Sequence, residues 1–228
     1  GQVRHAAAHH RQRFGPGGLS DQLTGFYRGD GKSLERIEAR GSSFLKTEEK
    51  GKNQEILARD MDFFFDDNQR LTKAVASGSA VARSLEKDAP REVTAEKMDA
   101  VFTPQAKGSD LTTVTTNSRT VMKIVPTDKA GNVTERVIEG DNATVTYFPG
   151  GKFVSRADAS GNAVMTITPL NPGPKSERRV LKAAKFAADF FDSGNAVKTF
   201  NAEGGATAEF IPTDASQKRP KKVLSGTK

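Results

Sequence analysis

LTKAVASGSAVA (residues 71–82) and VSRADASGNAVM (residues 154–165) are two copies of one motif, a glycine flanked by small residues. Three further copies are centred on Gly41, Ser118 and Gly204, so successive centres lie 37 to 43 residues apart. A period of about 20–50 residues is typical of proteins whose units bury apolar surface only against neighbouring units. The sequence therefore predicts an elongated stack of repeats, not a globule around one active site.

A second motif lies between the glycine motifs and has the form Ala-x-x-apolar-x-x-x-aromatic. Copies begin at Ala58, Ala95, Gly140 and Ala183, and a weaker copy begins at Ser20. Short stretches rich in Asp, Asn, Gly and Pro separate each copy from the next glycine motif, and these residues favour turns. Each unit is therefore expected to contain a segment, a turn, a second segment and a variable loop.

The spacing of the second motif fits two kinds of secondary structure. Positions 0, 3 and 7 share one face of a helix, and residues 176–191 alone would form a short amphipathic helix. The corresponding residues 135–148 are rich in β-branched and aromatic side chains and contain Gly140, which disfavours a helix. Because repeats share one structure, we predict an all-β chain with about ten or more antiparallel strands.

Small or apolar residues alternate with polar ones on both sides of each motif centre, which predicts one dry and one wet face. We expect the central glycine or serine to lie on the dry face, where a short side chain leaves room. The third residue after the centre breaks the alternation in Phe44, Val81, Val121 and Val164. This break predicts a bulge or a covered strand end.

The composition limits the possible interior. Apolar residues make up 35% of the chain and Trp is absent, so the small inward residues either leave an open channel or let two sheets pack closely. The net charge of +7 suits anionic partners or is simply a solvated surface. Cys is absent and no apolar run reaches about 18 residues, so we expect neither disulfides nor a spanning helix. The chain begins at Gly1 without a signal-peptide pattern, which favours a mature form or an excised fragment.

Candidate catalytic and metal-binding residues are poorly supported. The histidines, His5, His9 and His10, lie in an Ala- and Arg-rich stretch without nearby Cys, Asp or Glu. The acidic residues between Asp60 and Asp67 lack the glycine of a calcium loop. There is no nucleophile elbow, phosphate loop or stacking pattern of a nucleic-acid binder. We therefore expect no enzyme activity, no cofactor, no metal and no nucleic-acid partner.

The units VTAEKMDAVF…LTTVTTNSRTVM (from Val93) and RVLKAAKFAADFFDSGNAVKTFNAEGGATA (from Arg179) resemble the OstA-like family of periplasmic lipopolysaccharide-transport proteins. The resemblance covers about residues 20–210. The chain departs from the family pattern at Ser118, which replaces Gly, and at Gly140, which replaces Ala. Long inserts also follow the third and fourth glycine motifs.

The resemblance implies a twisted, open β-jellyroll built from about five strand-turn-strand repeats. The repeat period and the charge pattern divide the chain into an N-terminal segment (1–19) that reads as the end of a preceding repeat, a repeat domain (20–211) and a basic flexible tail (212–228). The resemblance also implies a periplasmic protein that carries lipopolysaccharide or a related lipid between the inner and outer membranes. Partners would be like domains, joined head to tail through edge strands, and membrane transport components.

In such a protein the acyl chains would lie in an apolar groove, because each CH₂ removed from water contributes about 0.8 kcal/mol. The residues expected to line the groove are Ile37, Ala39, Leu45, Phe65, Ala74, Ala76, Ala80, Phe102, Val114, Met122, Tyr147, Ala163, Met165, Phe190, Phe200 and Ala202. Two alternatives remain open from the sequence. One is a structural β-repeat rod with a filled interior, and the other is a metal- or polyanion-binding module that uses the basic tail.

Overall fold

The computed structural model describes residues 3–6, 12–13, 18–49, 52–84, 90–125, 131–151, 153–173, 176–192, 197–213 and 220–226. These residues form strands and turns but no helix, and every strand pair is antiparallel. The all-β prediction is therefore confirmed. Among the described residues no helix is long and apolar enough to span a membrane.

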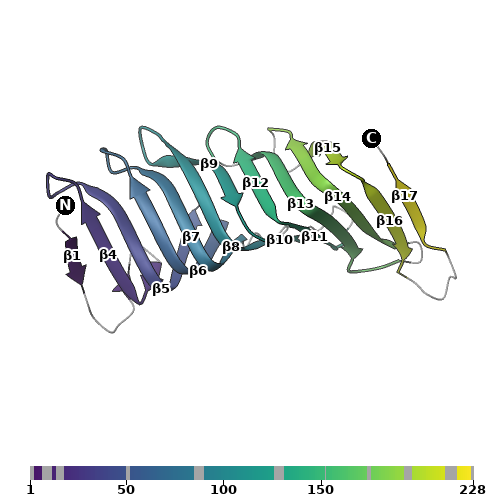
Figure 1. The fold of residues 1–228 in the computed structure, drawn as a ribbon, viewed down its shortest axis with the longest axis horizontal. Coiled ribbons are helices and arrows are strands. Elements are labelled where there is room, and N and C mark those ends of the chain that lie inside the picture. Colours follow the sequence, from purple (N-terminus) through teal and green to yellow (C-terminus); the bar gives the residue numbers. More distant parts are fainter. Residues whose placement is uncertain are drawn as a thin grey trace.

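The molecule is elongated, and its strands lie side by side across the long axis, with the two termini at opposite ends (Figure 1). The strands are β1 Val3–Ala6, β2 Gln12–Arg13, β3 Gly18–Ser20, β4 Gln22–Tyr27, β5 Leu34–Glu49, β6 Lys52–Phe65, β7 Leu71–Ser84, β8 Arg91–Pro104, β9 Ser109–Thr116, β10 Thr120–Ile124, β11 Thr134–Gly140, β12 Asn142–Tyr147, β13 Val154–Pro169, β14 Glu177–Phe190, β15 Val197–Glu203, β16 Thr207–Pro212 and β17 Lys222–Ser225. Strand β17 lies within the stretch 212–228 that we expected to be a flexible tail, and there it pairs with β16.

Several long strands belong to two layers at once. The first half of β5 pairs with β4 and its second half pairs with β3. In the same way β13 pairs with β12 and then β11, and β14 pairs with β16 and then β15. The sheet is therefore bent into two arms that share these strands. We call them the first arm (β4, β9, β12, β15 and the adjoining halves of the long strands) and the second arm (β3, β10, β11, β16, β17 and the other halves).

The bend between the arms coincides with the glycine motifs. In four of them the central glycine and the next residue both have positive φ: Gly41 and Ser42 (74° and 48°), Gly78 and Ser79 (78° and 57°), Gly161 and Asn162 (75° and 52°), and Gly204 and Gly205 (78° and 70°). The left-handed region suits Gly and is tolerated by Asn and Ser more readily than by branched residues. At the first, second and fourth motifs the strand registers shift at these two residues. Each is a bulge that turns the strand from one arm to the other.

The same bend explains why the second motif has a helix-like spacing. Ala58 pairs with Ser43 on the second-arm side of the bend, whereas Met61 pairs with Ala39 on the first-arm side. Both side chains are buried, and the two residues between them occupy the bend. A separation of three residues therefore keeps two strand residues on one face, because the bend interrupts the period of two.

The central glycines do not lie on the dry face, so that expectation was wrong. A Cβ at Gly78 would come within 2.6 Å of the Arg59 Cβ, and one at Gly204 within 2.5 Å of the Ala184 Cβ. Arg59 and Ala184 are exposed. Glycine is required at these centres by the positive φ and by the close outer approach of the preceding strand, and not by the width of the interior.

The third motif makes its bend without glycine. Here the chain leaves the sheet between β9 and β10, and the two flanking threonines are buried. The hydroxyls of Thr116 and Thr120 lie 2.5 Å apart, and the Ala143 amide donates to the Thr116 hydroxyl at 2.9 Å. The Thr120 hydroxyl also donates to the Ser118 carbonyl at 2.8 Å. This hydrogen-bonded group takes the place of the glycine bulge at Ser118.

The tightest packing follows the bend. One cluster of buried residues contains Ala39, Ala58, Met61, Ala76, Ala80, Ala95 and Met98. A second contains Ala163, Ala183 and Phe186. Half-buried apolar residues from both arms pack on these clusters, including Phe63 from the first arm and Val93 from the second. The core is thus a narrow seam of small residues along the inside of the bend.

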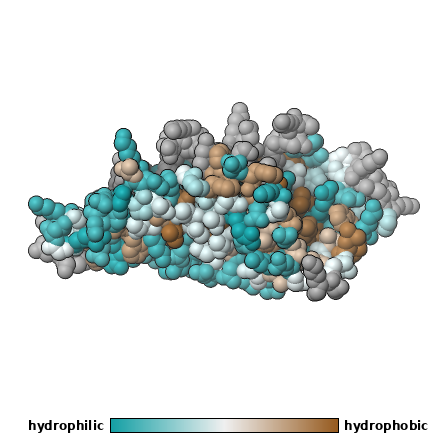
Figure 2. Space-filling view, turned by 90° about the horizontal axis from the view of Figure 1, so that it is seen from above, coloured by the Kyte–Doolittle hydropathy of each residue, from teal (hydrophilic) through white to brown (hydrophobic). Residues whose placement is uncertain are grey.

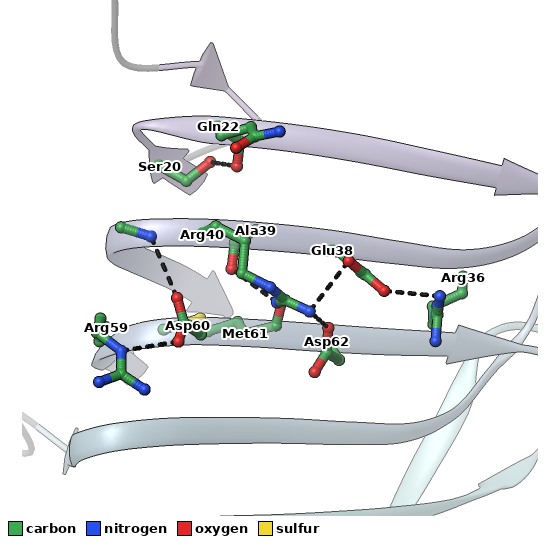
Figure 3. A network of polar contacts seen from close by, with 11 residues as sticks. Ser20, Gln22, Arg36, Glu38, Ala39, Arg40, Arg59, Asp60, Met61 and Asp62 are labelled. Atoms are coloured by element: carbon green, nitrogen blue, oxygen red, sulfur yellow. Dashed lines mark hydrogen bonds and ion pairs between the residues drawn. The ribbon is translucent and has the colours of Figure 1, made fainter. Parts of the chain in front are cut away.

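The outer face of the first arm is polar. Arg40 bridges Glu38 on its own strand and Asp62 on β6, at 3.1 and 2.6 Å (Figure 3). The Gly41 amide donates to Asp60, which tethers the bend to the same polar network. These ion pairs are partly exposed, and such pairs contribute about 0–1 kcal/mol each. Their position identifies this side as the wet face.

Candidate functional site: an apolar inner face

The face enclosed by the two arms carries rows of apolar residues that cross the whole sheet. On the first arm, cross-strand partners follow one another without interruption from β4 to β15. The row contains Gly25, Ile37, Phe63, Ala74, Ala100, Val114, Val145, Ala157, Ala188 and Phe200. Neighbouring strands are about 4.8 Å apart, so ten strands give a row about 43 Å long.

A matching row crosses the second arm from β3 to β17. It contains Gly18, Leu45, Ile56, Ala82, Val93, Met122, Ile138, Met165, Leu181, Ala208 and Leu224. Leu45 and Phe63, which come from different arms, pack against the same buried cluster. The two rows therefore face a common interior.

A third row follows the bend on the first-arm side. It contains Leu23, Ala39, Met61, Ala76, Met98, Thr116, Ala143, Ala159, Phe186 and Ala202. Thr116 is the single hydroxyl in this row, and its hydrogen bonds are made within the bend. The row is therefore apolar along nearly its whole length.

The structure brings most of the residues predicted from the sequence onto this inner face. Ile37, Ala74, Val114 and Phe200 lie in the first-arm row, Ala39, Ala76 and Ala202 in the bend row, and Leu45, Met122 and Met165 in the second-arm row. Ala80 and Ala163 lie at the bend and are fully buried. Phe65, Phe102, Tyr147 and Phe190 end the first arm, each opposite an aliphatic residue of the next strand.

Several residues that complete the first-arm row were not predicted from the sequence. Phe63, Ala100, Val145 and Ala188 share the first-arm row with the predicted residues. They lie two residues before each terminal aromatic. Strand parity counted from the aromatic would have found them, whereas the helix-like spacing of 0, 3 and 7 skips them.

Burial decreases away from the bend. Ala80 and Ala163 are 0% exposed and Phe186 is 3% exposed, whereas most of the first-arm row is half-buried and Phe200 is 40% exposed. The rings of Phe186 and Phe200 lie 5.6 Å apart, so the two phenylalanines form a continuous apolar step from the bend outward. The inner face is therefore sealed along the bend and accessible toward the tips of the arms.

Three further observations indicate an open architecture. The accessible surface is 13905 Å², whereas a compact monomer of this mass exposes about 10,000 Å². Seen from above, the molecule shows patches of hydrophobic side chains between polar ones along its length (Figure 2). A cavity of about 770 Å³ lies at the tips of the first arm, between the β6–β7 and β8–β9 turns, and Phe65, Arg70, Leu71 and Phe102 contribute to its lining.

The residues that break the alternation form a row of their own on the outer face of the second arm. Phe44 pairs with Leu57, Leu57 with Val81, and Val121 and Val164 each pair with Glu139. These apolar side chains are half-buried. At Phe44, Val81 and Val164 the break in parity reflects the bulge just before them, which is one of the two explanations that the sequence offered, and not a second inward register.

The other candidate sites give no functional geometry. Within the described ranges no group of three or more His, Asp or Glu side chains could hold a metal ion. His9 and His10 lie outside the described residues. Asp66 accepts hydrogen bonds from the Asn68 and Arg70 amides and from the Arg70 guanidinium, which are the contacts of a hairpin turn. The Arg70 guanidinium is the main reason that the pKa of Asp66 is lowered.

No family model, curated protein or solved structure matches this chain. The geometry of the inner face is therefore the basis for inferring function.

Proposed function

We propose that this protein binds lipid without catalysing a reaction and that the acyl chains lie along the apolar rows of the inner face. The observation that carries the proposal is the first-arm row from Ile37 to Phe200, which is apolar at every position, about 38 Å long and mostly half-buried. Half-buried apolar surface of this extent is typical of ligand-binding grooves. Each CH₂ placed there contributes about 0.8 kcal/mol.

The ligand class and the setting follow from the family resemblance. They are lipopolysaccharide or a related lipid, a periplasm of the Gram-negative type and a bridge between inner and outer membranes. The ends of the sheet support an assembly of like domains: within the described residues β1, β15 and β17 each pair with one neighbour and leave one edge free. Similar cross-sections along the rows would let a lipid slide from unit to unit without chemistry in this chain.

A photo-crosslinking pair tests the proposal. Val114 and Thr115 are neighbours on β9, and Val114 lies in the first-arm row whereas Thr115 lies on the opposite face. A benzophenone amino acid at position 114 should capture a clickable lipopolysaccharide or phospholipid, and the same group at position 115 should capture little. Equal labelling at both positions, or no labelling at either, would contradict the proposal and favour the filled structural rod.

A further inference from the structure

The second arm carries a row of cations on its inner face, at the lip farthest from the bend. Cross-strand partners define the row from β7 to β17. It contains Ser84, Arg91, Ile124, Arg136, Ile167, Arg179, Phe210 and Lys222. A cation thus stands on every second strand, and an apolar residue separates it from the next. With about 4.8 Å between strands, the cations are about 10 Å apart.

The three arginines of this row differ from most other arginines of the chain because they lack acidic partners. On the outer face and in the turns, carboxylates pair with Arg36, Arg40, Arg59, Arg70, Arg83, Arg119 and Arg156. Within the described part of the chain, no ion pair or hydrogen bond involves the side chains of Arg91, Arg136 or Arg179. The row itself contains no carboxylate.

The acidic residues directly next to the row in sequence pair with cations of the outer face. Glu92 follows Arg91 and points to the outer face, where it pairs with Arg83 at 2.6 Å. Glu135 precedes Arg136 and pairs with Lys123 at 2.5 Å, also on the outer face. The Arg91 Nε is buried without a hydrogen-bond partner. A buried, unpaired donor on a cation is costly, and an anionic group supplied by a ligand would satisfy it.

The cationic lip faces the aromatic ends of the first arm. Burial raises the pKa of Tyr147, and the positive charge of Arg91 acts on the same phenol in the opposite direction. Tyr147 ends β12 on the first arm, whereas Arg91 begins β8 on the second arm. Their electrostatic interaction therefore crosses the interior. One lip of the groove is aromatic and aliphatic, and the other is cationic.

We infer that Arg91, Arg136, Arg179 and Lys222 form a binding site for the anionic groups of a lipid headgroup, with phosphate as the best fit to the guanidinium fork. The inference rests on the proposed function. Along each strand the apolar second-arm row lies two residues nearer the bend, or about 7 Å. A lipid with its acyl chains on that row therefore has its headgroup at the cationic lip. Repeated cations favour a headgroup that carries more than one anionic group.

The test compares two single-chain amphiphiles of equal length, dodecyl phosphate and an uncharged dodecyl glycoside, each used below its micelle concentration. Affinities are measured by isothermal titration calorimetry for the parent chain and for the inner variant R91Q/R136Q/R179Q. The matched control K97Q/R178Q/K182Q removes three exposed charges from the outer face. Circular dichroism melting checks that both variants are folded, and inorganic phosphate serves as a third ligand.

The parent should bind dodecyl phosphate about tenfold or more tightly than the glycoside, and the preference should weaken at high salt. The inner variant should lose this preference and keep its affinity for the glycoside, whereas the control should resemble the parent. A parent that binds both amphiphiles alike would overturn the inference and leave the proposed function intact. A parent that binds neither amphiphile would overturn the proposed function as well. Inorganic phosphate that binds as tightly as dodecyl phosphate would overturn the assignment to a lipid headgroup.

Discussion

Gly78 and Arg59 lie against each other on the outer side of the bend, so closely that a Cβ at Gly78 would stand 2.6 Å from the Arg59 Cβ. In addition, Gly78 has a φ of 78°, which lies in the left-handed region. Gly78→Ala should therefore lower the free energy of unfolding by about 1–3 kcal/mol. Gly29→Ala is the matched control, because nothing lies within 4 Å of a Cβ there and its φ is not in the left-handed region. Urea unfolding measures both, and an equal effect would show that the bend does not need glycine.

The threonine group at the third bend gives a second prediction. Thr116→Val keeps the shape of the side chain and removes the hydroxyl that accepts from the Ala143 amide. Because this amide and the Thr120 hydroxyl would lose a buried partner, the free energy of unfolding should fall by about 1–3 kcal/mol. Thr103→Val, at an exposed position of β8, should change it by less than about 0.5 kcal/mol. Hydrogen exchange at the Ala143 amide should quicken in the first variant only.

Filling the inner face separates an open groove from a packed interior. Ala100 is half-buried in the first-arm row, whereas its neighbour Val101 is 43% exposed on the opposite face. Ala100→Phe should melt close to the parent temperature and bind lipid more weakly, and Val101→Phe should change neither property. Overfilling a packed core costs about 1–3 kcal/mol, so marked destabilisation by Ala100→Phe would indicate the rod. Ala80→Phe, at the fully buried bend, should be destabilised in either case.

The stability of the outer face should depend on pH through Asp158. Arg156 donates two hydrogen bonds to this carboxylate, at 2.7 and 2.9 Å, and Lys185 lies 3.1 Å away. The hydrogen bonds from Arg156 are the main reason that the pKa of Asp158 lies below its ordinary value. A lowered pKa in the folded state stabilises the fold above the unfolded pKa of about 3.9, and this contribution is lost as the pH falls below it.

Asp158→Asn should therefore reduce the loss of stability between pH 7 and pH 3 by about 0.5–1 kcal/mol, since the ion pairs are partly exposed. Chemical denaturation at the two pH values measures the difference. Asp192→Asn is the control, because this exposed aspartate has no ion pair among the described residues. The same change in both variants would show that the Arg156 contacts do not contribute.

The sequence predicted the strands and the inner face because both depend on local patterns. The alternation of small and polar residues on both sides of Gly78 and Gly161 is visible without knowing which strands pair with each other. The face of the sheet on which the central glycines lie was not predictable in the same way. It depends on the side from which Arg59 and Ala184 of the preceding strands approach the bend. Parity counted through Gly78 placed it inward, whereas the bulge of two left-handed residues turns it outward.

The cationic lip shows a second limit of sequence analysis. Arg91, Arg136 and Arg179 lie 43 to 45 residues apart and belong to no motif that we recognised. Only the registers of β8, β10, β11, β13 and β14 show that they form one row. The arginines of the outer face look the same in the sequence as those of the row, and they differ only in having a carboxylate as a partner, on their own strand or on the next one.

Each motif makes its own bend from residues within the unit and the strand before it. A closed sheet must match its strand number to its diameter, but among the described strands β1 and β17 are not paired with each other, so no closure sets the curvature. Adding or deleting one unit would therefore change the length of the molecule by about 10 Å and leave its cross-section as it was. Duplication of a single unit in the gene is thus a route by which such a chain can be lengthened without redesign of its interior.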